Sequence, residues 1–193
     1  MELKTAISVI AVALAFIGYA PYLRDVVRRK TTPHAFTWLV WTLAVGISCA
    51  LQIAGGAGVG AWTTAAVTLI CVVVLGLSLF YGTTVATKSD VIFLILALIA
   101  LALWVFARQP VWSAILIVLT DVLGFVPTVR KSWNNPHSET LSMYEITGIR
   151  HGLSIFALQQ YNILTLLYPI TWVIANLAFS ALLIARRAIL SRN

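Results

Sequence analysis

Long apolar segments alternate with short polar connectors along the whole chain. The connectors carry the residues that turns require, for example Gly55-Gly56 and Asn134-Asn135-Pro136. A hydrocarbon core about 30 Å thick requires about 20 mostly apolar residues per helix, because lipid offers the backbone no hydrogen-bond partners. The pattern therefore predicts an all-α membrane protein with seven transmembrane helices, near residues 6–22, 35–53, 61–81, 91–107, 112–129, 141–158 and 163–184.

The composition supports a membrane protein. The chain has 61% hydrophobic and 10% charged residues, whereas soluble domains have about 25% charged residues. The first apolar segment does not read as a signal peptide, because its basic cluster, which begins at Arg24, follows the segment instead of preceding it. Cys49 and Cys71 lie within apolar segments, where a free cysteine behaves as a small hydrophobe. We expect no disulfide, no metal site and no cofactor.

The basic residues are distributed unevenly between the two sets of connectors. If the N-terminus lies outside, the outer side receives only Lys4 and Arg108. An excess of Lys and Arg marks the cytoplasmic side, which predicts a cytoplasmic C-terminus in a bacterial inner membrane. The net charge of +7 then reflects a basic face beside anionic lipid, and the lipid bilayer is expected to be its partner instead of a nucleic acid. The inner side receives Arg24, Arg28, Arg29, Lys30, Lys88, Arg130, Lys131, Arg186, Arg187 and Arg192.

An ordered set of features occurs twice in the chain. The segment Gly18-Tyr19-Ala20-Pro21 is followed by a basic loop and then by Pro33-His34. About 106 residues later, Gly124-Phe125-Val126-Pro127 is followed by a basic loop and then by Pro136-His137. Further aromatic pairs match Trp41 with Tyr144 and Trp62 with Trp172. The repetition predicts two related units.

Three helices make an odd number of crossings, so two such units joined directly would be inverted relative to each other. The fourth apolar segment restores their parallel orientation and has no counterpart in the repeat. We therefore predict a 3+1+3 organisation, with a first three-helix repeat at 1–85, a linker helix at 86–109 and a second repeat at 110–193. Parallel repeats occur in transporters whose substrate site lies between them near the bilayer midplane.

These prolines, basic loops and the 3+1+3 layout resemble the PQ-loop and SWEET (MtN3/saliva-like) superfamily. Its members include sugar transporters, lysosomal cystine and cationic amino-acid transporters and, more distantly, the KDEL receptor. The family signature has a glutamine after the first proline, whereas Tyr22 and Thr128 stand there in this chain. The resemblance implies alternating access between two three-helix bundles. It also implies a substrate-binding asparagine on the third helix of a unit, which Asn176 matches.

Four prolines lie inside or at the ends of predicted helices: Pro21, Pro33, Pro127 and Pro136. Proline removes a backbone donor and its ring clashes with the preceding turn, so it permits a bend. Pro21 and Pro127 are each preceded by a glycine three residues earlier, which favours a hinge. For Pro33 and Pro136, a hinge and a simple helix boundary remain alternatives.

Ionisable residues within the predicted helices all belong to the second unit: Asp121, Glu145, Arg150 and His151. A charge at membrane depth costs about 2.5–3.5 kcal/mol, so these groups are expected to face protein or water. They are candidates for coupling transport to protons, or for an ion pair between helices, such as Arg150 with Asp121 or Glu145. His151 is a candidate proton relay or a hydrogen-bond donor.

The last apolar segment places Tyr168, Trp172 and Asn176 at four-residue spacing and therefore on one helix face. Aromatic rings stack on sugars or cations, and an amide binds hydroxyls or carboxylates. These three residues, together with Tyr144, Trp41 and Trp62, are the predicted substrate-binding residues. Interfacial anchoring is the alternative for the aromatic residues.

The leading hypothesis is a transporter that moves a small polar solute, sugar-like or amino-acid-like, by alternating access. A membrane receptor or sorting protein with the same fold is the alternative. An intramembrane enzyme is less expected, because Asp121, Glu145 and His151 lack the spacing of a known catalytic set. Oligomerisation is not required, since seven helices complete both units.

Overall fold

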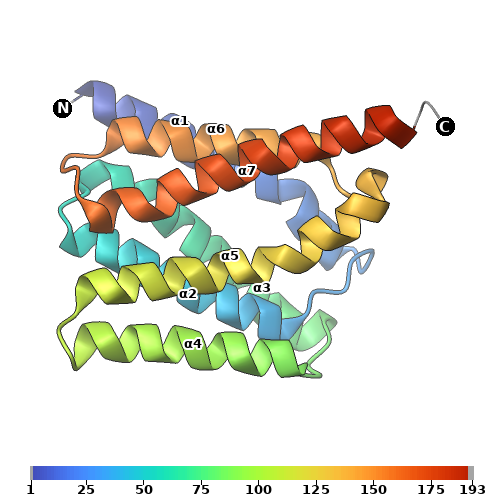
Figure 1. Ribbon diagram of the computed structural model, residues 1–193, viewed down its shortest axis with the longest axis horizontal. Helices are drawn as coiled ribbons and strands as arrows, with labels where there is room; N and C mark the ends of the chain where they lie inside the picture. The colour runs from blue at the N-terminus through green and yellow to red at the C-terminus, as the bar shows by residue number, and fades with distance from the viewer. Residues whose placement is uncertain (1, 191–193) are drawn as a thin grey trace.

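The computed structural model describes residues 2–190, apart from the side chains of Pro127, Lys131 and Ser138. This part of the chain is helical, and its strand-like pairing is one isolated β-bridge. The helices run side by side, with the two ends of the chain at opposite ends of the molecule (Figure 1). The elements are α1 (Glu2–Val27), α2 (Ala35–Ala54), η1 (Gly58–Ala61), α3 (Trp62–Tyr81), α4 (Lys88–Val105), α5 (Pro110–Asn134), η2 (Pro136–Ser138), α6 (Leu141–Ala157) and α7 (Ile163–Leu190).

All seven predicted helices are present, and several are longer than their apolar segments. α1 continues past Pro21 to Val27, and α5 continues past Pro127 to Asn134. A helix keeps its internal hydrogen bonds when it enters the headgroup region, so the apolar run underestimates its length. Pro21 therefore lies inside α1, and Pro127 lies inside α5 although its side chain is outside the described part.

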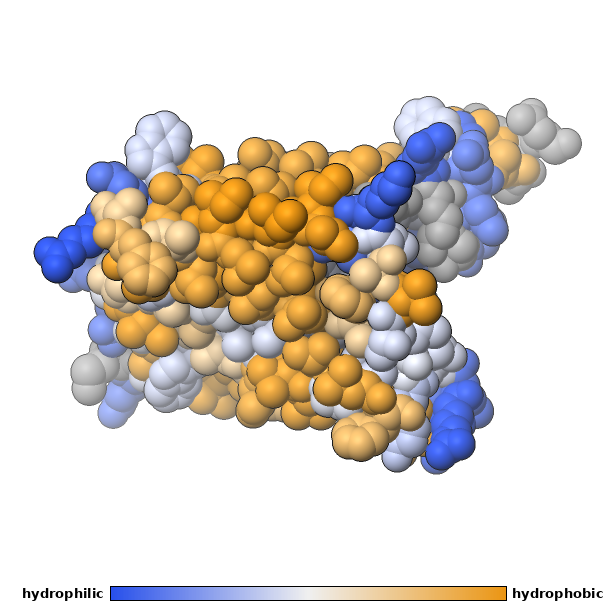
Figure 2. Space-filling view, turned by 90° about the horizontal axis from the view of Figure 1, so that it is seen from below, coloured by the Kyte–Doolittle hydropathy of each residue, from blue (hydrophilic) through white to orange (hydrophobic). Residues whose placement is uncertain are grey.

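Among the described residues, six helices are long and apolar enough to cross a membrane: α1, α2, α3 with η1, α4, α5 and α7. α6, with 17 residues, is shorter than the others and contains Glu145, Arg150 and His151. On the face drawn in Figure 2, a broad hydrophobic band separates hydrophilic residues at the two ends of the molecule. These features are those of an integral, multi-pass membrane protein.

Two sets of three helices make corresponding contacts; we call α1, α2 and α3 the first group and α5, α6 and α7 the second group. α3 packs against α1 and α2, and α7 packs against α5 and α6. Between the groups, α1 meets α6, α2 meets α5 and α7, and α3 meets α6. Each of these contacts has a counterpart when α1, α2 and α3 are exchanged with α5, α6 and α7. α4 packs on α5 and α2, and its buried residues are the small Ala97 and Ala100.

At the N-terminal end of the molecule, two connectors bind each other; we call residues 55–61 and 158–162 the connector seal. The Gln159 backbone N–H donates to the Ala57 carbonyl at 3.0 Å, and the Asn162 side-chain amide donates to the Gly55 carbonyl at 2.7 Å. A Cβ on Gly60 would lie only 2.7 Å from the Leu158 Cα, so the backbones are in close contact. The seal joins the connector that precedes α3 to the one that precedes α7.

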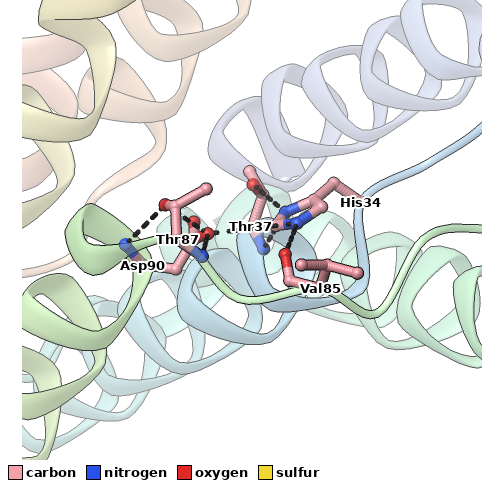
Figure 3. A network of polar contacts seen from close by, with 5 residues as sticks. All are labelled: His34, Thr37, Val85, Thr87 and Asp90. Carbon is pink, nitrogen blue, oxygen red and sulfur yellow. Dashed lines mark hydrogen bonds and ion pairs between the residues drawn. The ribbon is translucent and has the colours of Figure 1, made fainter.

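At the opposite end, the α1–α2 connector binds the segment that joins α3 to α4. The Thr83 N–H donates to the Pro33 carbonyl, and the Ala35 N–H donates to the Thr83 carbonyl. His34 begins α2: its Nδ1 accepts from the Thr37 N–H, and its Nε2 lies 2.8 Å from the Val85 carbonyl and 3.9 Å from Asp90 (Figure 3). The start of α2 is thus attached to the end of α3 and the start of α4.

The second group has an equivalent attachment. The Arg187 guanidinium near the end of α7 donates to the Pro136 carbonyl at 2.9 and 3.1 Å, and to the Glu139 carbonyl at 2.7 Å. Pro33 and Pro136 therefore lie in connectors before α2 and α6, and the carbonyl of each proline accepts hydrogen bonds from another element. This favours a helix boundary over a hinge at both positions. This end of the molecule is notched on the face drawn in Figure 2.

Candidate functional site

A cavity of about 150 Å³ lies between the two helix groups. It extends from the middle of the helices to Thr128 near the end of α5 and Met143 in the first turn of α6. It therefore approaches the end of the molecule opposite the connector seal. We call this the basic end, because it carries Arg24, Arg28, Arg29, Lys30, Lys88, Arg130, Arg186 and Arg187. Its lining comprises Tyr19, Trp41, Val45, Val67, Cys71, Asp121, Phe125, Thr128, Met143, Tyr144, Thr147, Arg150, His151, Tyr168, Trp172 and Asn176.

The two groups contribute to the cavity from equivalent helix positions. Val67 and Tyr168 each lie five residues after the first residue of their helices, α3 and α7. Cys71 and Trp172 each lie nine residues after it. On the first helices, Tyr19 and Phe125 each precede the matched proline by two residues, and on the second helices Trp41 faces the cavity as Tyr144 does.

The polar groups of the cavity come mainly from the second group of helices. Asp121 on α5 is 5% exposed, and one of its carboxylate oxygens accepts a hydrogen bond from Trp172 Nε1 at 3.1 Å. Asn176, 2% exposed, donates from its side-chain amide to the Trp172 carbonyl at 2.7 Å. Asp121 is thus hydrogen-bonded to a side chain of α7.

Arg150 and His151 lie side by side on α6 and are both buried. Arg150 Nη2 is 3.2 Å from His151 Nε2. In the described part of the chain, no carboxylate lies within the 4.0 Å that defines an ion pair with Arg150. The predicted pair of Arg150 with Asp121 or Glu145 is therefore not formed in this structure, although Arg150 and Asp121 line one cavity.

Aromatic rings form one wall of the cavity. Phe125 contacts both Tyr144 and Trp172, with ring centroids 6.0 and 5.7 Å apart. Tyr168 packs edge-on against His151 and against Trp172. This wall connects α5, α6 and α7, so a shift of one helix would displace the rings that it contacts on the other two.

A second cavity, of about 320 Å³, lies between α2, α4 and α5. It extends from Thr37, Thr87 and Asp90, in the polar network of Figure 3, to Thr120 and Gly124. Asp121 and Trp41 line both cavities. Asp121 therefore stands between the central cavity and a route that reaches the basic end beside α4.

Two residues predicted for the site lie elsewhere. Trp62 is the first residue of α3, is 45% exposed, and does not line the cavity. When positions are counted from the first residue of each helix, Cys71 of α3 is equivalent to Trp172 of α7. Glu145 is exposed on α6. It is about 140° around the helix from Arg150, so it faces away from the cavity that Arg150 lines.

The other predicted binding and coupling residues line the central cavity: Asn176, Trp172, Tyr168, Tyr144, Trp41, Asp121, Arg150 and His151. Sequence reasoning missed Tyr19 and Phe125, although the repeated motif contained them, since an aromatic residue stands between the glycine and the proline in both copies. It also missed Val67 and Cys71, which carry no polar signal that would separate them from lipid-facing residues. The hinge roles of Pro21 and Pro127 stay predictions.

Comparisons with family models, with curated proteins and with solved structures found no match to this chain.

Proposed function

We propose that this chain is a transporter of the PQ-loop and SWEET type, which moves a small polar solute across the membrane by alternating access between two three-helix repeats. The observation that carries the proposal is the central cavity: Asp121, Arg150 and Asn176 are buried at membrane depth between mostly apolar helices. Ionisable groups at that depth are costly and characteristically mark a substrate or ion pathway.

The arrangement of contacts supports two repeats, at 1–85 and 110–193, joined by a linker helix at 86–109. The contacts between α1, α2 and α3 and those between α5, α6 and α7 correspond, and so do the contacts across the interface. α6 takes part in this correspondence as the counterpart of α2. Its 17 residues are at the short end of the range for a membrane-spanning helix, so we propose it as the seventh span.

Alternating access requires a cavity that opens to one side at a time. The connector seal closes the N-terminal end, whereas the cavity extends toward the basic end. With the basic end in the cytoplasm, this corresponds to a state closed to the outside. Breaking the seal while closing the basic end would give the opposite state.

Uptake into proteoliposomes tests the proposal. The purified chain should carry out time-dependent uptake of at least one solute from panels of sugars, amino acids and vitamins, with and without a pH gradient. Protein-free liposomes and a chain cross-linked across the connector seal are the controls. Retention of uptake by the cross-linked chain, or no uptake of any solute, would contradict the proposal.

A further inference from the structure

The guanidinium of Arg150 points to the kind of solute that the central cavity takes. Arg150 is 3% exposed and lines the cavity. Its Nη1 atom is fully buried and has no hydrogen-bond partner in the part of the chain that the structure describes. Buried polar atoms nearly always have a partner, so an unpaired guanidinium nitrogen beside a cavity indicates a missing one.

Within residues 2–190, no carboxylate forms an ion pair with this cation. Nη2 of Arg150 lies 3.2 Å from a ring nitrogen of His151, which brings no negative charge. The Asp121 carboxylate lines the same cavity but is engaged by Trp172 and is more than an ion-pair distance from Arg150. A buried charge without a partner is strongly unfavourable, because its desolvation is not repaid.

A carboxylate fits what Arg150 lacks. Guanidinium presents donors in a rigid planar fork that matches the two oxygens of a carboxylate, and such paired contacts are short and strong. The available space, about 150 Å³, is below the range of roughly 300–1,000 Å³ of pockets for drug-sized ligands. The occupant is therefore a small molecule.

We propose that the central cavity binds a small carboxylate-bearing solute, with Arg150 as the residue that holds its carboxylate. The inference rests on the proposed function and specifies its substrate class. A neutral sugar would bring hydroxyl groups but would leave the buried guanidinium without a counter-ion. Asp121 and the rings of Tyr168 and Trp172 lie in the same cavity and offer an acceptor and π-faces for an ammonium group, when the solute is an amino acid.

Binding to the purified chain in lipid nanodiscs tests the inference with pairs of probes that differ only at the carboxyl group. The pairs are alanine with alaninamide, and lactate with lactamide; glucose is the neutral comparison. We expect alanine or lactate to bind at least tenfold more tightly than its own amide. Tighter binding of alanine than of lactate would support the inference and show that the ammonium group is bound as well, whereas similar binding of both acids would support the carboxylate contact alone.

Substitution of Arg150 locates the contact. Arg150→Gln should abolish the preference for the acid over the amide, whereas Arg108→Gln removes an equal charge from an exposed connector and should leave the preference unchanged. If Arg150→Gln does not fold, Arg150→Lys serves instead: it keeps the charge but not the fork, so the acid should still be preferred with affinity reduced about tenfold. An unchanged preference in Arg150→Gln, or in Arg150→Lys an unchanged affinity, would overturn the assignment.

The inference and the proposed function fail in different ways. Equal binding of acids and amides, binding of glucose alone, or no binding of any acid would overturn the carboxylate class; measured uptake of a neutral solute would then leave the transporter proposal standing. Acid binding that depends on Arg150, without uptake of the same acid into proteoliposomes, would support the inference and contradict transport.

Discussion

At the scale of single residues, Asn176 has both a cavity position and a structural contact. Its amide donates to the Trp172 carbonyl, and a neutral hydrogen bond contributes about 1 kcal/mol. We expect Asn176→Ala to weaken solute binding at least tenfold while lowering the free energy of unfolding by about 1 kcal/mol or less. Titration of binding and thermal unfolding of the same preparation measure the two effects. A loss of stability as large as the loss of binding energy would identify Asn176 as a packing residue.

Asp121 is the residue that we expect to couple transport to protons. It lines both cavities, lies six residues before Pro127, and is bound by Trp172. A carboxylate takes up a proton more readily where it is less solvated, so two conformations that hydrate Asp121 differently would bind the proton with different affinity.

Asp121→Asn imitates the protonated side chain. The variant should lose uptake driven by a pH gradient and keep exchange, at equal pH on both sides, of a solute without an ammonium group, such as lactate. Half-buried Asp25, which pairs with Arg24 and lines neither cavity, gives the control Asp25→Asn, which should keep both activities. Concentrative uptake by Asp121→Asn along an imposed pH gradient would show that the proton is bound elsewhere.

The ionisable residues of the site could be predicted from the sequence, whereas its small apolar residues could not. Asp121, Arg150 and His151 were identifiable because placing an ionisable group at membrane depth costs free energy, so such a residue in an apolar segment indicates a functional or structural role. Val67 and Cys71 were not, since a small apolar side chain looks alike whether it faces lipid, another helix or a cavity. The exposure of Glu145 was not predictable from its cost alone, because the fifth residue of α6 lies close to the basic end of the helix.

At the scale of the elements, the connector seal depends on a glycine. A Cβ at Gly60 would lie 2.7 Å from both the backbone and the side chain of Leu158. Gly60→Ala should therefore separate the two connectors and favour opening at the N-terminal end. Cys71 lines the central cavity and can report this opening.

The measurement is the rate at which Cys71 reacts with a membrane-impermeant thiol reagent added from outside, with Cys49 replaced by Ser. Gly60→Ala should raise the rate several-fold. Gly76→Ala is the matched control, because a Cβ there meets nothing within 4 Å. Equal rates in the two variants would show that the seal does not limit access.

Helix positions were largely predictable at this scale, and helix neighbours were not. The apolar runs located all seven helices because a run of that length has few other uses in a protein. Which helices touch depends on side-chain fit, and a helix that is apolar all round shows no face that marks its partner. The packing of α3 between α1 and α2 had no signal in the spacing of residues.

At the scale of the whole molecule, the charge asymmetry predicts one orientation. In a background with Cys49 and Cys71 replaced by Ser, a cysteine at Leu3, which is 73% exposed, should react with an impermeant reagent added to intact cells. A cysteine at Ser191 should react only after the membrane is permeabilised. The reverse labelling pattern would invert the orientation and place the connector seal on the cytoplasmic side.

The placement of α4 has a consequence for how the chain can be divided. α4 packs on α5 and α2, and the connector after it, residues 106–109, is exposed. Two separately encoded polypeptides, 1–108 and 109–193, should therefore assemble and restore uptake when produced together. Paired with itself, the first fragment would surround its central space with Tyr19, Trp41, Val45, Val67 and Cys71, without an ionisable carboxylate or guanidinium. Such a homodimer is expected to be stable in the bilayer but inert toward charged solutes.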